Sequence, residues 1–168
     1  MNTLLLDPIR DDGALRQAGA LLRAGEVVGM PTETVYGLAA NALDGAAVAK
    51  IFLAKGRPQD NPLIVHIADK EQLSTLARMV PESARKLADA FWPGPLTIIL
   101  PKAACIPDEV SAGLDTVGIR LPSHPVARAL IREAGVPLAA PSANLSGRPS
   151  TTTSGHVMDD LGGKIPAI

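Results

Sequence analysis

Two segments of this sequence combine prolines with small polar or charged side chains, a composition suited to binding a polar ligand. Residues 31–38 (PTETVYGL) follow a predicted strand and carry hydroxyls, a carboxylate and a phenol. Residues 140–150 (APSANLSGRPS) follow another, and their small hydroxyl and amide side chains would let a phosphate or ribose approach closely. Ligands of open α/β sheets bind where strands end. Each segment alone also has a structural interpretation. Residues 31–38 are typical of a turn that caps the next helix, and residues 140–150 of a flexible loop.

Two cations follow a predicted helix. Lys55 and Arg57 stand two residues apart, in a stretch that Pro58 and Pro62 stiffen. Such a pair suits an oligo-anion such as a polyphosphate. The alternative is a solvated helix end, where Lys and Arg interact favourably with the helix dipole.

Two further polar residues lie inside predicted strands. Arg120, in TVGIRL, needs an anionic partner if its strand is buried, either a structural Asp or Glu or a substrate carboxylate. His66, in PLIVHI, is typical of a hydrogen-bonded core residue more than of a ligand. We expect His156 at the surface and the single Cys105 as a small buried hydrophobe. The sequence contains no P-loop, dinucleotide-binding, nucleophile-elbow or zinc-protease motif.

The elements that must position these residues indicate one α/β domain spanning residues 1–168. Hydrophobic periodicity and turn residues predict helices and strands that mix without strict alternation, so we expect a mixed, twisted sheet flanked by helices. The predicted helices are 12–24, 46–54, 70–79, 81–91 and 124–134. The predicted strands are 26–30, 62–67, 96–100, 116–121 and 136–140.

Composition excludes several classes of function. The 168 residues include 16 Lys and Arg against 17 Asp and Glu, so no global basic field recruits nucleic acid. Four aromatic residues are too few for the stacking platforms of many RNA-binding proteins. One cysteine excludes an intrachain disulfide framework and a multi-cysteine zinc site. No secretory signal or membrane-spanning apolar run is recognisable, so we expect a cytoplasmic protein with no membrane partner.

Five blocks taken together resemble the Sua5/YrdC/YwlC family of threonylcarbamoyl-AMP synthases, in the family's order and spacing. They are PTETVYGL (31–38), KGRPQDNPLIVHI (55–67), WPGPLT (92–97), AGLDTVGIR (112–120) and APSANLSGRPS (140–150). The resemblance implies a YrdC-like twisted mixed sheet around a concave, positively charged cavity. It also implies a nucleotidyltransferase that condenses L-threonine, bicarbonate and ATP, with Mg²⁺ and no organic cofactor, into threonylcarbamoyl-AMP and pyrophosphate. A partner enzyme would then transfer the threonylcarbamoyl group to adenosine 37 of tRNA.

The resemblance also implies the site residues. The characteristic catalytic set of K-x-R and S-x-N corresponds to Lys55, Arg57, Ser142 and Asn144. The expected nucleotide contacts are Arg57, Asn61, Thr116, Ser142 and Ser150. The expected threonine contacts are Thr34, His66, Arg120 and the backbone of Ala140. No residue of the protein is assigned as a metal ligand.

The family pattern continues beyond residue 165 to a G-x-E-S-T-[VI] strand, and longer members carry a second domain. Since the sequence stops at Ile168, we expect a chain truncated before that strand, with no second C-terminal domain and doubtful full activity. One alternative is a non-catalytic nucleotide- or RNA-binding module, with a weak RNA contact. Another is the carbamoyl-transfer domain of a hydrogenase-maturation protein, but the zinc-finger and acylphosphatase segments of such proteins are absent here.

Overall fold

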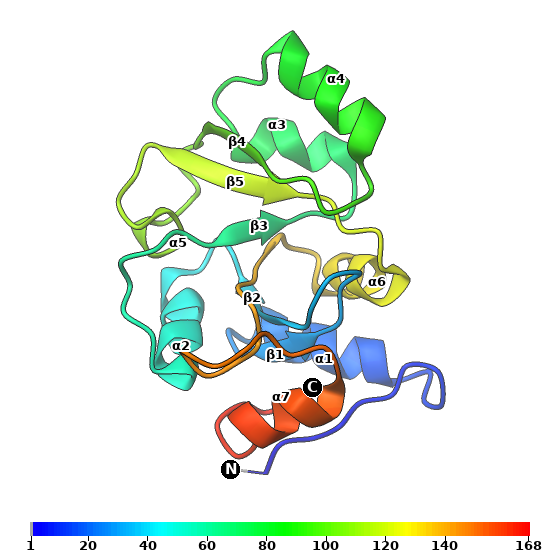
Figure 1. The fold of residues 1–168 in the computed structure, drawn as a ribbon. Coiled ribbons are helices and arrows are strands. Elements are labelled where there is room, and N and C mark those ends of the chain that lie inside the picture. Colours follow the sequence, from blue (N-terminus) through cyan, green and yellow to red (C-terminus); the bar gives the residue numbers. More distant parts are fainter. Residues whose placement is uncertain (1) are drawn as a thin grey trace.

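A six-stranded sheet with helices around it forms the body of the molecule, in a computed structural model that describes residues 2–168 (Figure 1). The strands are β1 (Val28–Met30), β2 (Gly37–Asn41), β3 (Ile64–His66), β4 (Ile98–Pro101), β5 (Thr116–Arg120) and β6 (Leu138–Ala139). The helices are α1 (Ala14–Arg23), α2 (Gly45–Lys55), α3 (Leu73–Leu76), α4 (Glu82–Phe91), α5 (Asp108–Ser111), α6 (Pro125–Ala134) and α7 (Ser154–Leu161), and the 3₁₀ turn η1 (Lys70–Gln72) precedes α3.

The sheet is mixed, as the sequence predicts. Its strand order is β1-β2-β6-β3-β5-β4, and only β3 and β5 run parallel. In this parallel pair Ile64 lies opposite Gly118, and His66 lies opposite Arg120. The register therefore brings the two polar strand residues of the sequence side by side at the carboxyl ends of their strands.

Small and branched apolar residues fill the core on both faces of the sheet. One cluster joins α2 and α7 to β3 and β5, and the other joins α1 and α6 to β1 and β6. Helices α1 and α6 pack directly against each other. Among residues 2–168 the buried polar or charged side chains are Lys55, His66, Ser111, Arg120, Asn144 and Thr151. Four of these six are residues that the sequence selected for a site.

The sequence misses three elements, β2, α5 and α7. The β2 sequence GLAAN has a glycine, two alanines and an asparagine, all of them poor strand formers, so only its pairing with β1 and β6 makes it a strand. Residues 31–38 consequently lead into a strand and do not cap a helix. The predicted helix 70–79 is a 3₁₀ turn followed by the short α3. The expectation for Cys105 is wrong because its side chain is exposed.

The ends of α2 are defined by local chemistry, and they place Lys55. At the N-terminus the Asp44 carboxylate accepts hydrogen bonds from the backbone N–H groups of Ala46 and Ala47. At the C-terminus Gly56 adopts φ +60°, a left-handed conformation that glycine tolerates and that stops the helix directly after Lys55.

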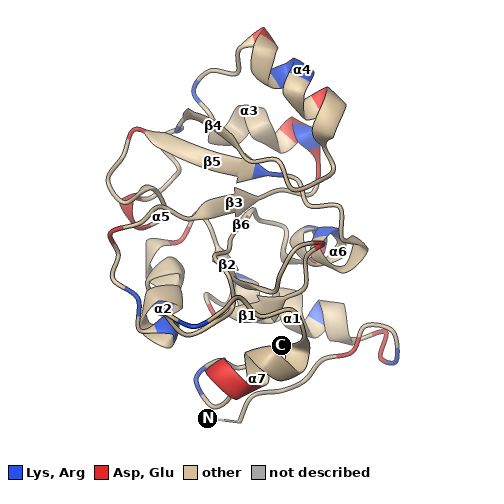
Figure 2. Cartoon of the chain, in the orientation of Figure 1, with Lys and Arg blue, Asp and Glu red and all other residues tan. Residues whose placement is uncertain are grey.

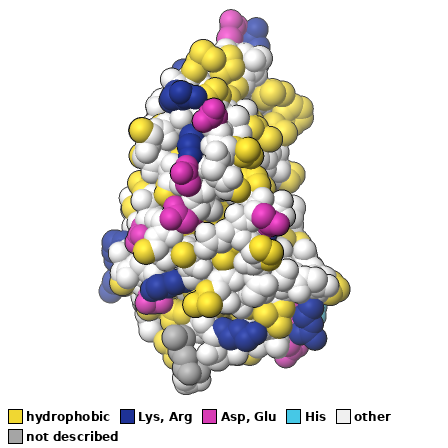
Figure 3. Space-filling view, turned by 90° about the vertical axis from the view of Figure 1, so that its left-hand side faces the viewer, with side chains coloured by type: hydrophobic (Ala, Val, Ile, Leu, Met, Phe, Trp, Pro, Cys, Tyr) yellow, Lys and Arg dark blue, Asp and Glu magenta, His cyan; other side chains and the backbone are white. Residues whose placement is uncertain are grey.

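Surface charges of both signs intermix on the face shown in Figure 3. No helix within residues 2–168 has the length and hydropathy that crossing a membrane requires.

Removing the N-terminal cap of α2 should destabilise the fold. We expect Asp44→Ala to lower the free energy of unfolding by about 1 kcal/mol, because two backbone N–H groups lose their acceptor. Urea unfolding followed by circular dichroism measures the change. The same substitution at the exposed Asp12 is the control and should stay within about 0.5 kcal/mol of the unchanged chain. An equal effect of the two substitutions would contradict the capping role.

Candidate functional site

Lys55 is the most unusual residue of the candidate site, because its ammonium group is buried. The residue is only 3% exposed, so it is not the solvated helix end that was the alternative for the Lys55–Arg57 pair. Its Nζ donates to the backbone oxygens of Ser142 and Asn144, the latter at 2.5 Å. Burial lowers the pKa of Lys55 to about 8, with a further contribution from the nearby charge of Arg57. The contact joins the end of α2 to the loop that carries the S-x-N pair.

The loop of residues 140–150 is held on one side by the sheet. Its Pro141 oxygen accepts from the N–H of Leu38 at 2.8 Å, and the N–H of Ala143 donates to the oxygen of Tyr36 at 2.8 Å. The N–H of Ala140 donates to the oxygen of Ile64 at 3.0 Å. The loop thus continues the backbone pairing of the strands, which contradicts the interpretation of this segment as a freely flexible loop.

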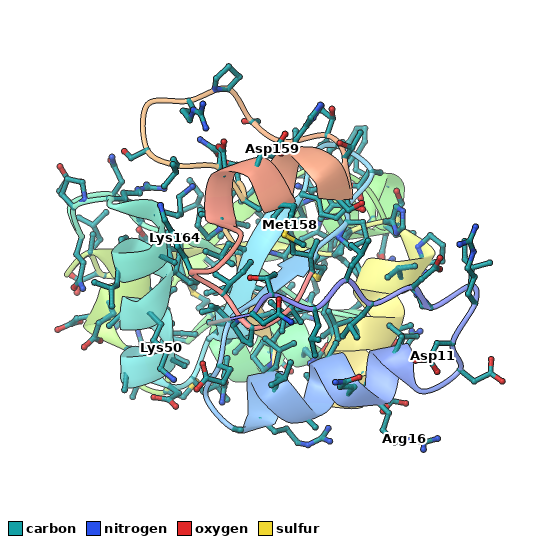
Figure 4. All side chains as sticks on the ribbon, turned by 90° about the horizontal axis from the view of Figure 1, so that it is seen from below. Asp11, Arg16, Lys50, Met158, Asp159 and Lys164 are labelled. Carbon is teal, nitrogen blue, oxygen red and sulfur yellow. The ribbon has the colours of Figure 1, made fainter. Side chains whose placement is uncertain are left out.

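Helix α7 holds the same loop from the other side. The Asp160 carboxylate accepts from the N–H of Leu145 at 3.0 Å and pairs with the guanidinium of Arg148. The Asn144 side chain donates to the oxygens of Leu145 and Arg148, at 2.9 and 2.8 Å. Figure 4 shows α7 beside this loop, with Met158 directed towards the body of the molecule and Asp159 on the outer side.

Arg120 forms a second charged centre, at the end of β5 (Figure 2). Its Nη2 donates to the Glu33 carboxylate and lies 3.3 Å from Thr34 Oγ1. Of the two partners that the sequence allows for this arginine, the structure contains the structural carboxylate. Burial raises the pKa of Glu33, but the hydrogen bond and charge of Arg120 outweigh it and hold that pKa below its ordinary value.

His66 lies beside Arg120 and is buried. Its Nδ1 is 3.2 Å from the backbone oxygen of Ile64, which matches the predicted hydrogen-bonded core histidine. Burial, assisted by the positive charge of Arg120, lowers the pKa of His66 to about 4. The imidazole is therefore neutral at pH 7, so it offers a ring nitrogen and not a charge to a ligand.

Two of the remaining predicted residues, Asn61 and Thr116, lie at the opposite end of the parallel strand pair. Asn61 precedes β3 and is exposed, and Thr116 begins β5 and is half-buried. The four residue-to-residue steps from Thr116 to Arg120 span about 13 Å of extended strand. Arg57 is half-buried and Ser150 is exposed, and His156 is exposed as predicted. Asn61 and Thr116 thus lie at one end of the parallel strand pair, and Arg120 and His66 lie at the other.

Two other features bear on what could bind. Within residues 2–168 no group of three or more His, Cys, Asp or Glu side chains could hold a metal ion. An apolar cavity of about 370 Å³ lies between residues 5–9, α1 and α6, and neither Lys55 nor Arg120 lines it. The positive charge predicted for a concave cavity stays a prediction.

Sequence reasoning misses the partners of both buried cations. Glu33 is visible in PTETVYGL as a carboxylate, but nothing local links it to Arg120, 87 residues away. Asp160 lies in a helix that the periodicity does not reveal. Of these contacts, the sequence indicates only that of Arg120, because a buried arginine requires an anionic partner.

The buried ammonium of Lys55 should make stability depend on pH. Between about pH 8 and the ordinary lysine value of 10.5, the folded Lys55 has lost its proton while the unfolded residue keeps it. The unfolded state then binds more protons, so the free energy of unfolding should rise with pH across this window. Denaturant unfolding at several pH values measures the slope. Lys55→Met should remove this part of the rise, whereas Lys86→Met, on the exposed face of α4, should retain it.

Asp160 should modulate the same titration. Its negative charge favours the protonated form of Lys55, so we expect Asp160→Asn to lower the Lys55 pKa below about 8. NMR titration of ¹³C-labelled lysine side chains measures it. Asp159→Asn, at the exposed neighbouring position, is the matched control. If the Lys55 pKa is unchanged in Asp160→Asn, the negative charge of Asp160 does not stabilise the protonated form of Lys55, and this prediction is wrong.

Comparison with known proteins places this geometry in one family. The profile named Sua5_yciO_yrdC and described as "Telomere recombination" matches residues 20–168. The threonylcarbamoyl-AMP synthase of Bacillus subtilis is 60% identical over 162 residues, which cover 94% of this chain and 46% of that protein. The synthase of Pyrococcus abyssi is 54% identical over 158 residues, with the same two shares.

A solved structure agrees with the sequence comparison. The crystal structure of P. abyssi Sua5 complexed with L-threonine superposes with a TM-score of 0.95 at 52% identity, over 99% of this chain and 49% of that chain. This chain spans about half the length of the curated relatives named here. Its sequence and its fold agree that it belongs to the Sua5/YciO/YrdC family.

Proposed function

We propose that this chain acts as an L-threonylcarbamoyladenylate synthase, a nucleotidyltransferase that joins L-threonine, bicarbonate and ATP. One observation carries the proposal: the fold matches that of a Sua5 protein complexed with L-threonine, and in this chain Thr34, His66 and Arg120 lie together. The homologues named threonylcarbamoyl-AMP synthase support the same activity. The product would serve the threonylcarbamoylation of adenosine 37 in tRNA by a downstream transfer enzyme in the cytoplasm.

At the threonine end, Arg120 would bind the substrate carboxylate through a charge-assisted hydrogen bond. Thr34 Oγ1, 3.3 Å from the guanidinium, is near enough to contact the same substrate. Neutral His66 and the backbone of Ala140 would complete the subsite. Strand pairing fixes the backbones of the two buried residues, His66 and Arg120, so the subsite needs little rearrangement on binding.

At the nucleotide end, Lys55 and Arg57 would face the phosphates of ATP. An ammonium group has three donors, and two of those on Lys55 bond to the backbone oxygens of Ser142 and Asn144. The third has only a long contact of 3.5 Å with Asn144 Oδ1, which a phosphate oxygen would replace. An anion nearby would also raise the pKa of Lys55 and keep it charged. Asn61, Thr116, Ser142 and Ser150 would contact the rest of the nucleotide.

The reaction needs no nucleophilic side chain. The neutral amine of threonine attacks bicarbonate, which loses water as the N-carboxylate forms, or attacks CO₂, in which case the amine nitrogen releases a proton to solvent. An oxygen of that carboxylate then attacks the α-phosphorus of ATP, and the bond to the departing pyrophosphate breaks. Negative charge develops on the pyrophosphate, where the cations of Lys55 and Arg57 stabilise it. Catalysis is therefore positioning and electrostatics.

Mg²⁺ would enter with ATP and neutralise phosphate charge. The residues present fit this role, because Mg²⁺ is commonly held by substrate phosphates and water with few protein carboxylates. Residues 2–168 offer cations at the phosphate end and no carboxylate cluster. Direct RNA contact would be weak, since 16 Lys and Arg against 17 Asp and Glu provide no overall positive field.

Substitution of the phosphate-end cations tests the proposal. We expect Lys55→Ala or Arg57→Ala to lower kcat/KM by about 10²–10³, the range for loss of a preorganised charge donor. The measurement is pyrophosphate release from ATP, with threonine and bicarbonate supplied singly and together. The exposed Lys86→Ala is the control and should leave the rate unchanged.

The same assay separates the alternatives. Release that requires both threonine and bicarbonate supports the synthase. Binding of ATP with no such release would favour the non-catalytic module, and release with carbamoyl phosphate in place of threonine would favour a carbamoyl-transfer domain. Unchanged turnover in both cation variants would overturn the roles of Lys55 and Arg57.

A further inference from the structure

We propose that Glu33 is a positioning residue of the threonine subsite, which holds the Arg120 guanidinium in place for the substrate carboxylate. The inference rests on the proposed function and assigns a role to a carboxylate that does not itself need to touch the substrate. It starts from the fact that Arg120 is 8% exposed and is the charged residue at the end of β5.

Glu33 ties three elements together at this point. One carboxylate oxygen accepts from Arg120 Nη2 at the end of β5. The other accepts from the backbone N–H groups of Ser123 and His124, at 3.1 and 3.4 Å, directly before α6. Glu33 itself belongs to the loop that connects β1 with β2, and Figure 1 shows this loop extending to α6. The carboxylate is therefore fixed from two sides.

This anchoring favours a fixed support over a latch that the substrate must displace. Two of the donors are main-chain N–H groups at the start of α6, a ten-residue helix whose N-terminus attracts negative charge. The lowered pKa of Glu33 keeps the carboxylate ionised at neutral pH. The Glu33 side chain is 20% exposed and that of Arg120 10%, so solvent screens their attraction only weakly.

The arrangement leaves part of the guanidinium available. The Glu33 carboxylate and Thr34 Oγ1 both accept from the same nitrogen of Arg120, Nη2. The Nε–H of Arg120 is buried and has no hydrogen-bond partner among residues 2–168. Buried donors are normally satisfied, so this N–H marks where a second acceptor belongs. Glu33 holds one nitrogen of the guanidinium, and a substrate carboxylate would bond to the remaining N–H groups.

A carboxylate beside Arg120 could instead compete with the substrate for the guanidinium. The two roles predict opposite changes in the affinity for threonine when Glu33 loses its charge. A support that orients Arg120 makes threonine bind more weakly when its charge is removed. A competitor for Arg120 makes threonine bind more tightly after the same change. The substitution Glu33→Gln removes the charge, keeps the shape and retains an acceptor for the N–H groups of Ser123 and His124.

Calorimetric titration with L-threonine and, separately, with ATP provides the test. We expect Glu33→Gln to raise the Kd for threonine about tenfold, the scale of one charge-assisted contact, and to leave the Kd for ATP within twofold. Glu33→Asp keeps the charge on a shorter side chain, so its Kd for threonine should lie between those of the unchanged chain and of Glu33→Gln. Glu82→Gln, at an exposed site of α4, is the matched control and should change neither Kd.

A double-mutant cycle tests whether Glu33 acts through Arg120. In an Arg120→Gln background, Glu33→Gln should change the Kd for threonine by less than twofold. An equal effect in both backgrounds, tighter binding by Glu33→Gln alone, or a parallel loss of ATP binding would overturn the positioning role. If the unchanged chain binds threonine and Glu33→Gln binds it equally well, this role alone fails. Absence of threonine binding by the unchanged chain would overturn the proposed function and this role with it.

Discussion

Burial of the Lys55 ammonium is the constraint on which the phosphate end of the proposed site depends. A buried cation is tolerated only where polar groups replace the water it loses, and here the backbone oxygens of Ser142 and Asn144 do so. Those oxygens are available because the loop is paired with the sheet on one side and bonded to Asp160 of α7 on the other. The end of α2, the 140–150 loop and α7 therefore have to be arranged together.

The parallel pairing of β3 with β5 determines the arrangement of the Arg120 end of the proposed site. It fixes His66 opposite Arg120 at the carboxyl ends, and it leaves Asn61 and Thr116 near the amino ends of the same two strands. The general expectation that ligands lie beyond strand carboxyl ends thus describes only the Arg120 end. The proposed nucleotide contacts Asn61 and Thr116 thus lie at the end of the strand pair away from Arg120, which suits a substrate assembled from an amino acid and a nucleotide.

Sequence patterns predict most of this fold, and the exceptions have physical causes. The strands around PLIVHI and TVGIRL are evident because branched residues dominate them, whereas β2 is built from Gly and Ala and owes its conformation to its neighbours. Lys55 and Arg120 are recognisable as chemically unusual, but their partners are not. A carboxylate such as Glu33 or Asp160 pairs across many residues of sequence, and no local periodicity records that contact. The exposed Cys105 shows that residue type alone is a weak guide to burial.

The two buried cations are compensated in different ways, and this difference matches the two halves of the proposed substrate. Lys55 is surrounded by neutral carbonyl oxygens, and Asp160 is the nearby counter-charge among residues 2–168, so its end keeps an excess of positive charge together with Arg57. Arg120 is paired with Glu33, so its end is close to neutral before any ligand binds. An uncompensated cation attracts a polyanion such as a triphosphate, while a neutralised but oriented guanidinium offers directional hydrogen bonds. A neutral end also suits an amino acid whose amine must lose its proton before it can react.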